Sequence, residues 1–201
     1  MEYFDVVTED GEPTGETVSR ELAHRDGILH RTAHVWLVRE DGRGGHQILL
    51  QKRSREKDSY PGLYDTSSAG HIPAGDEPKP SALRELKEEL GLTATEDQLA
   101  YAGRFRIQYE KVFHGRLFRD NEVSEVYVYT EPVEAENLVL QASEVEEVRW
   151  FDLDEVWEEL ERGSERFCVP KQSLRLLRDW LEDTPPGACP ISRQERELPL
   201  T

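Results

Sequence analysis

Three glutamates near the middle of the chain have the spacing of side chains that share one face of a helix. They are Glu85, Glu88 and Glu89, in the segment RELKEEL. At about 100° of rotation per residue, their carboxylates fall within an arc of roughly 100°, and leucines occupy a separate arc. Like charges at this spacing repel one another, and the last turn of a helix disfavours anions. A hard cation such as Mg²⁺ or Mn²⁺, bound through carboxylate oxygens, would offset that repulsion. The alternative, in a chain this acidic, is a solvated helix face.

The residues around these glutamates extend the pattern. The stretch GHIPAGDEPKPSALRELKEELGL resembles the Nudix box, G-x5-E-x7-R-E-U-x-E-E-x-G-U, in which U is an aliphatic residue. Asp76 stands where the family usually has glutamate, and it is one methylene shorter but still anionic. The other fixed positions match at Gly70, Arg84, Glu85, Leu86, Glu88, Glu89, Gly91 and Leu92.

The resemblance implies hydrolysis of a diphosphate linkage, in a nucleoside diphosphate derivative or a related small molecule. In such a reaction water attacks phosphorus, and metal ions held by carboxylates neutralise phosphate charge and activate the water. The resemblance assigns Glu85, Glu88 and Glu89 as ligands of Mg²⁺ or Mn²⁺. It also predicts that Arg84 pairs with Asp76 and orients the glutamates. The alternative for Arg84 is an ordinary helix pair with Glu88.

Two further roles follow from this chemistry. The basic segment QKRSREK precedes the box, and its Lys52, Arg53 and Lys57 are predicted to bind substrate phosphate. The alternative is a solvated strand end. The base that activates water varies in this superfamily, and the candidates here are Glu85, Glu122 and Glu125.

The similarity extends beyond the box to VTEDGEPTGETVSRELAHRDGILHRTAHVWLV, ILLQKRS, YPGLYD and SAGH. These segments resemble the isopentenyl-diphosphate isomerase-like branch of the superfamily. Enzymes of that branch bind a metal through three histidines and two glutamates. Such a donor set would suit Zn²⁺ or Mn²⁺ more than Mg²⁺. The alternative is that His24 and His34 are exposed or capping histidines. The matching positions of this possible second metal site are His24, His30, His71, Asp120 and Glu122.

One position departs from the isomerase pattern. Ala69 stands in DTSSAGH where that branch places its catalytic cysteine, and no other cysteine lies nearby in the sequence. Alanine cannot shuttle a proton, whereas the box keeps its carboxylates, so a hydrolase is favoured over an isomerase. A non-catalytic metabolite-binding protein on the same scaffold is a third possibility, and the intact carboxylates argue against it.

Composition limits the classes of partner and compartment. The chain has 201 residues, a net charge of −17 and 33% charged residues. This acidic balance argues against non-specific binding to nucleic acid or to an anionic membrane, and leaves a small-molecule diphosphate as the expected partner. The chain has two cysteines, no CxxC motif, no apolar leader and no apolar run of about 18 residues. A cytoplasmic location is expected.

Strands and helices alternate around these motifs, which predicts a mixed sheet with helices on both faces. The Nudix resemblance likewise implies an α/β/α sandwich. One domain is expected over residues 1–182, followed by a loose Pro-rich tail at 183–201. Its expected parts are an N-terminal hairpin at 1–18, the Nudix box at 70–92 with a helix at 78–90, and C-terminal helices at about 152–182.

The remaining expected elements position the candidate residues. Ser19 is expected to cap a short helix that carries His24. A basic loop, KVFHGRLFR, is expected between the third and fourth of the later strands. The expected strands after the hairpin cover residues 32–39, 47–53, 100–110, 122–130 and 146–151.

Overall fold

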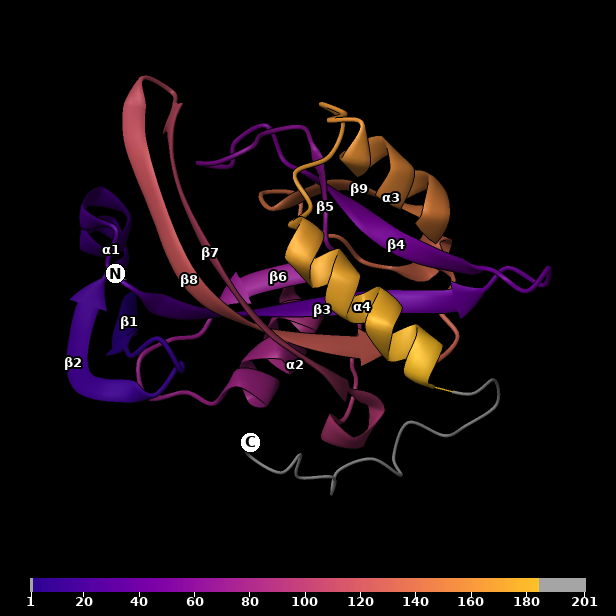
Figure 1. Ribbon diagram of the computed structural model, residues 1–201, viewed down its shortest axis with the longest axis horizontal. Helices are drawn as coiled ribbons and strands as arrows, with labels where there is room; N and C mark the ends of the chain where they lie inside the picture. Colours follow the sequence, from indigo (N-terminus) through magenta and orange to yellow (C-terminus); the bar gives the residue numbers. More distant parts are fainter. Residues whose placement is uncertain (1, 185–201) are drawn as a thin grey trace.

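The computed structural model describes residues 2–184, in which helices cover both faces of a mixed sheet (Figure 1). This confirms the predicted α/β class and layer order. The helices are α1 (Arg20–Asp26), α2 (Pro78–Leu90), α3 (Leu153–Glu161) and α4 (Lys171–Asp183), with short 3₁₀ turns η1 (Glu96–Gln98) and η2 (Ala135–Asn137). The strands are β1 (Tyr3–Val7), β2 (Pro13–Ser19), β3 (His30–Glu40), β4 (His46–Arg53), β5 (Tyr64–Asp65), β6 (Ser68–His71), β7 (Ala100–Phe113), β8 (Arg116–Tyr129) and β9 (Val145–Asp152).

The main sheet has the order β5-β4-β3-β8-β7, with β6 paired to β3 and β9 paired to β4. Strands β3 and β8 run parallel, and the other pairs are antiparallel. Successive side chains of a strand point to opposite faces. Along β3, Val35 and Leu37 therefore pack in the core beneath α2, whereas Trp36 and Val38 pack in the core beneath α3 and α4.

Local sequence explains where the box helix begins and ends. Helix α2 spans the predicted residues 78–90, with proline in its first turn, where a missing N–H costs nothing. Gly91 ends the helix with a φ of 67°, a conformation that glycine adopts without strain. Leu86 and Leu90 are fully buried against the sheet. Glu89, beside Leu86 and Leu90 on the helix, is also buried, and its carboxylate contacts β6.

The prediction of a basic loop at KVFHGRLFR is wrong. Strands β7 and β8 continue through this segment as a long hairpin that extends past the rest of the sheet (Figure 1). The turn consists of His114 and Gly115, whose φ values of 50° and 76° suit a tight hairpin turn. Phe113 and Phe118 pack edge to face at 5.9 Å, which holds the two strands of the arm together.

The N-terminal hairpin forms as predicted, from β1 and β2. Phe4 pairs with Pro73 in an isolated bridge, and the Ala74 N–H donates to the carbonyl of Tyr3 at 2.8 Å. These bonds attach β1 to the loop between β6 and the box helix. Of the predicted tail at 183–201, residues 185–201 lie outside the described residues. None of the helices within residues 2–184 has the length and the apolar character that a membrane span requires.

Candidate functional site

The first residue of the box lets a strand pass close beneath the box helix. A Cβ placed on Gly70 in β6 would overlap the carboxyl carbon of Glu85 and lie 2.6 Å from its Oε1. Only a residue without a side chain allows this approach. The Glu85 carboxylate is mostly buried, and burial raises its pKa while Arg84 opposes that shift. The glycine thus fixes where Glu85 enters the pocket described below.

Glu89 is a buried carboxylate held by three hydrogen-bond donors. Its Oε2 accepts from the Ser68 hydroxyl at 2.7 Å, from the Gln51 amide at 3.3 Å and from the Ala69 N–H at 3.3 Å. The residue is 4% exposed. Burial raises the pKa of Glu89 to about 7, although the bond from Ser68 lowers it. A cation beside the carboxylate would offset the cost of keeping this charge buried.

Glu88 differs from the other two box glutamates because its side chain is half exposed. The Arg84 guanidinium lies 3.0 Å from Glu85 and 3.3 Å from Glu88. The predicted pair of Arg84 with Asp76 is therefore wrong, and the alternative pair with Glu88 is observed. Asp76 is exposed and precedes the first residue of the helix, whereas Arg84 lies in the second turn.

The box glutamates share a helix face, yet their depths differ. Within residues 2–184, groups of three possible ligand atoms within 4.8 Å of one another include His24, His30 and His71, and also His30, Asp120 and Glu122. Neither of these groups, found among the described residues, contains a box glutamate. In this structure Glu89 points down to β6 while Glu88 points outward.

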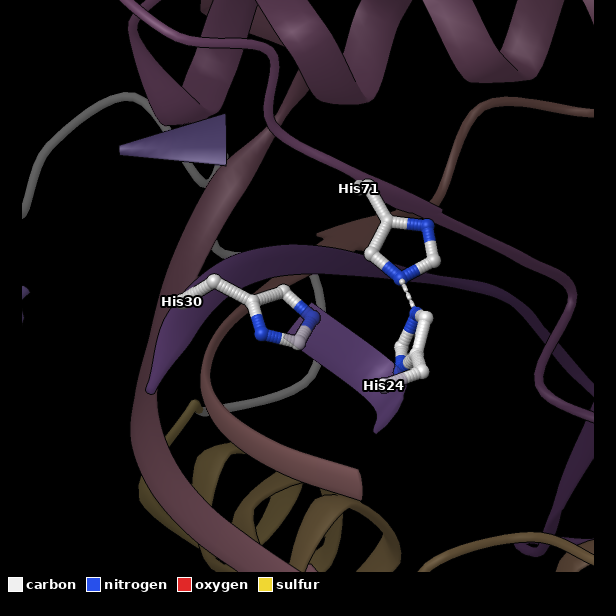
Figure 2. Close-up of side chains that lie close together, drawn as sticks. All are labelled: His24, His30 and His71. Carbon is white, nitrogen blue, oxygen red and sulfur yellow. Dashed lines mark hydrogen bonds between the residues drawn. The ribbon is translucent and has the colours of Figure 1, made fainter. Parts of the chain in front are cut away.

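The five residues of the predicted second site do come together, and we call them the histidine–carboxylate cluster. Figure 2 shows the imidazoles of His24, His30 and His71 turned toward one another. Nε2 of His24 lies 3.2 Å from Nε2 of His71. Oε1 of Glu122 lies 3.5 Å from His71 Nε2 and 3.6 Å from His30 Nε2, and Asp120 lies 3.5 Å from His24 Nδ1.

The five residues of this cluster come from four elements of the fold. His30 and Glu122 are register partners on the parallel strands β3 and β8, so their side chains leave the same face. His71 comes from β6, on the other side of β3. His24 comes from the last turn of α1, where its ring stacks on Phe118 at 4.3 Å. His24 is 6% exposed, which excludes the alternative that it is an exposed histidine.

Several buried polar atoms of the cluster lack a hydrogen-bond partner. They are Nδ1 of His24, Nε2 of His30 and Oδ1 of Asp120. The Nδ1–H of His30 donates to the Ile28 carbonyl at 2.8 Å, which leaves Nε2 as the nitrogen with a free lone pair. Burial lowers the pKa of His24 to about 4, so its imidazole is neutral at pH 7. Neutral imidazoles with orphaned nitrogens beside carboxylates fit a transition-metal cation.

A pocket of about 450 Å³ joins the box to this cluster. All three box glutamates border it, together with His24, His71, Asp120 and Glu122. Four cations, Arg20, Arg53, Lys57 and Arg84, also line it. The pocket thus presents carboxylates, imidazoles and cations to one space.

The predicted phosphate-binding residues divide into two groups. Arg53 and Lys57 line the pocket. Arg53 is oriented by Asp65 at 3.0 Å and donates to the Ser59 carbonyl at 3.0 Å. Lys52 follows the other face of β4 and lies 2.8 Å from Glu146. The assignment of Lys52 is therefore wrong, because neighbouring strand residues point to opposite faces.

The candidate bases also divide. Glu85 and Glu122 line the pocket. Glu125 is not one of the described residues that line the pocket. Its carboxylate accepts from the Tyr101 hydroxyl at 2.7 Å and lies 3.4 Å from Arg104. Glu125 is therefore not positioned to activate a pocket water.

Arg20, His34 and Cys168 are among the pocket residues that were not assigned from the sequence. Arg20 reaches the pocket from α1, and Cys168 reaches it from the segment before α4. His34 is 6% exposed, which excludes the exposed alternative, and it lines the pocket beside Ala69. The Ser173 hydroxyl lies 3.3 Å from His34 Nδ1. For His34, the alternation of side chains along β3 is the one sequence signal that could have predicted its position. Arg20 and Cys168 reach the pocket through long-range contacts.

Comparison with known proteins agrees with this geometry. The NUDIX domain family matches residues 28–171. "Nudix hydrolase 3" of Arabidopsis thaliana is 44% identical over 156 residues, which are 77% of this chain and 20% of that protein. This chain therefore spans about a fifth of that relative's length.

The chain is also similar to a second relative and to a solved structure. The isopentenyl-diphosphate delta-isomerase of Dinoroseobacter shibae is 31% identical over 145 residues, 72% of this chain and 76% of that protein. The crystal structure of DR0079 from Deinococcus radiodurans superposes with a TM-score of 0.64 at 17% identity, covering 88% of this chain and 98% of that one. The last likeness concerns the fold alone.

Proposed function

Because this chain belongs to the Nudix family, in its isopentenyl-diphosphate isomerase-like branch, we propose that it is a metal-dependent hydrolase of a diphosphate linkage in a small molecule. A nucleoside diphosphate derivative or a related compound is the proposed substrate. The observation that carries the proposal is the shared pocket, where box carboxylates face four cationic side chains.

The cations would bind the diphosphate. Arg53 is held by Asp65 and Ser59, so its guanidinium is oriented before a ligand arrives. Lys57 lies beside it in the pocket wall. Charged donors form the stronger hydrogen bonds to phosphate oxygens, and a preorganised arginine loses little freedom in forming them.

The carboxylates would bind the metal and accept a proton from the attacking water. Glu85, Glu88 and Glu89 would bind Mg²⁺ or Mn²⁺, and the histidine–carboxylate cluster would bind Mn²⁺ or Zn²⁺. A bound divalent ion neutralises phosphate charge and lowers the pKa of a water ligand. Glu85 or Glu122 would accept the proton of the attacking water, since both carboxylates border the pocket. A cytoplasmic location remains part of this proposal.

Isomerisation of an isoprenyl diphosphate is the second candidate. It is favoured by the complete histidine–carboxylate cluster and by Cys168, a thiol that lines the same pocket although it is distant in sequence. Against it, Ala69 occupies the cysteine position, and burial raises the pKa of Cys168 well above its ordinary value. The partly buried Cys168 thiol also donates to the carbonyl of Tyr64 at 3.5 Å. Hydrolysis is therefore favoured.

The test is a panel of diphosphates, including ADP-ribose and isopentenyl diphosphate, incubated with Mg²⁺ or Mn²⁺ and analysed for products. Hydrolysis products that disappear with EDTA would support the proposal. Glu88→Gln should abolish them, while Glu136→Gln, an exposed glutamate on η2, should not. Dimethylallyl diphosphate from isopentenyl diphosphate would replace the proposal with the second candidate.

A further inference from the structure

The N-terminal strand places an aromatic ring against the histidine–carboxylate cluster. Phe4 in β1 is fully buried. Its ring lies 4.8 Å from that of His30 at an angle of 13°, and 4.5 Å from that of His71 at 11°. It meets His24 edge to face at 6.3 Å and 75°. One phenyl ring therefore contacts all three imidazoles.

The ring distances show how the phenyl contacts the two imidazoles that it stacks on. The rings of His30 and His71 are 5.3 Å apart and inclined by 23°. A phenyl ring between them in a parallel stack would hold them about twice as far apart as each is from Phe4. Phe4 instead lies against both rings at once, and offset stacking of this kind favours a defined ring orientation.

The position of Phe4 is itself fixed by several contacts. Its backbone pairs with Val18 in β2 and with Pro73. The next residue, Asp5, accepts from the Gly75 N–H at 2.9 Å and from Arg31 at 3.2 Å. The bond from Gly75 ties the strand to the loop that follows β6, and the bond from Arg31 ties it to β3. Because the NUDIX family match begins at residue 28, the hairpin adds this support from outside the matched region.

We propose that Phe4 is a positioning residue for a metal bound at the histidine–carboxylate cluster. The phenyl ring holds the His30 and His71 imidazoles in the orientation in which their nitrogens converge near Glu122. The Ile28 carbonyl fixes the rotation of His30, whereas the hydrogen bond of the His71 ring joins it to His24, another member of the cluster. Stacking on Phe4 therefore orients the His71 ring from outside the cluster. This inference rests on the proposed metal site.

The test measures metal binding by the full chain, stripped of metal and titrated with Co²⁺, whose visible spectrum depends on the geometry of its ligands. His30→Ala identifies the part of the spectrum that depends on the histidines. Phe4→Leu keeps an apolar side chain but removes the flat ring, and should weaken that binding about 10- to 100-fold and alter its spectrum. Val18→Ala removes volume from the same core cluster and serves as the matched control. It should change neither quantity.

The possible results separate the two claims. If His30→Ala abolishes the signal while Phe4→Leu leaves affinity and spectrum unchanged, the positioning role is refuted and the metal site stands. Equal weakening by Phe4→Leu and Val18→Ala would also refute it, since the effect would then be general loosening of the hairpin. If His30→Ala changes nothing, the metal site and the inference both fail. Circular dichroism checks folding, and Phe4→Met, with its adaptable side chain, replaces Phe4→Leu if that variant does not fold.

Discussion

Replacing Glu89 with glutamine should stabilise the metal-free protein above neutral pH. In the unfolded chain the carboxyl has its ordinary pKa of 4.5, whereas burial raises the pKa of Glu89 to about 7 in the folded protein. Between these values the folded state holds a proton that the unfolded state has released. Folding stability therefore falls as pH rises from about 4.5 to about 7, and the loss is complete above that range.

The size of the effect follows from the difference between the two pKa values. Each unit corresponds to about 1.4 kcal/mol, so the raised pKa lowers the free energy of unfolding by about 3 kcal/mol at pH 8 and by about 1 kcal/mol at pH 5. Glutamine keeps a carbonyl oxygen that can accept from Ser68, Gln51 and the Ala69 N–H. The variant therefore loses the charge and keeps the acceptor.

Urea unfolding of both proteins in EDTA, at pH 5 and pH 8, measures this difference. The advantage of Glu89→Gln should grow between the two pH values by about 2 kcal/mol. Glu88→Gln is the control, because the Glu88 side chain is 52% exposed and should change stability by no more than about 0.5 kcal/mol. If the advantage of Glu89→Gln is absent at pH 8, or equal at both pH values, burial does not raise the pKa of Glu89 in the folded protein.

Three further predictions concern the pocket. Gly70→Ala should lower kcat about 100-fold, because the added methyl displaces Glu85, and a folded variant with full activity would contradict this. Lys57→Met should raise KM by roughly tenfold or more, whereas Lys52→Met, its matched control outside the pocket, should not; equal effects in steady-state assays would remove Lys57 from the binding site. Isopentenyl diphosphate should yield no dimethylallyl diphosphate in a product analysis, because Ala69 replaces the cysteine, and robust isomer formation would overturn that expectation.

The elements that the sequence predicts well are those whose boundaries depend on local chemistry. The box helix begins at a proline and ends at a glycine with positive φ, and both are visible in the sequence. Ser19 caps α1 through its own side chain, as expected, and Asp152 caps α3 in the same way. The hairpin arm of β7 and β8 was missed because charged residues on an exposed strand resemble those of a loop.

The site was predictable to the extent that a motif fixes its members. The three box glutamates and the five cluster residues all lie near the pocket or in its wall. The motif does not say how deep each carboxylate lies, so Glu88 and Glu89 were expected to be equivalent although one is exposed and one buried. Arg20 and Cys168 enter the pocket through long-range packing, which has no local sequence pattern.

The most direct test of the central claim is the rate of diphosphate cleavage by the wild type and by Glu88→Gln, with Mg²⁺ or Mn²⁺ and with EDTA, on the panel named above. Cleavage products should form only when the metal is present. In Glu88→Gln, kcat should fall at least about 100-fold, which corresponds to about 2.7 kcal/mol of activation free energy. Cleavage that persists in EDTA, or full activity in the folded Glu88→Gln protein, would contradict the claim that the box carboxylates carry a metal-dependent hydrolysis.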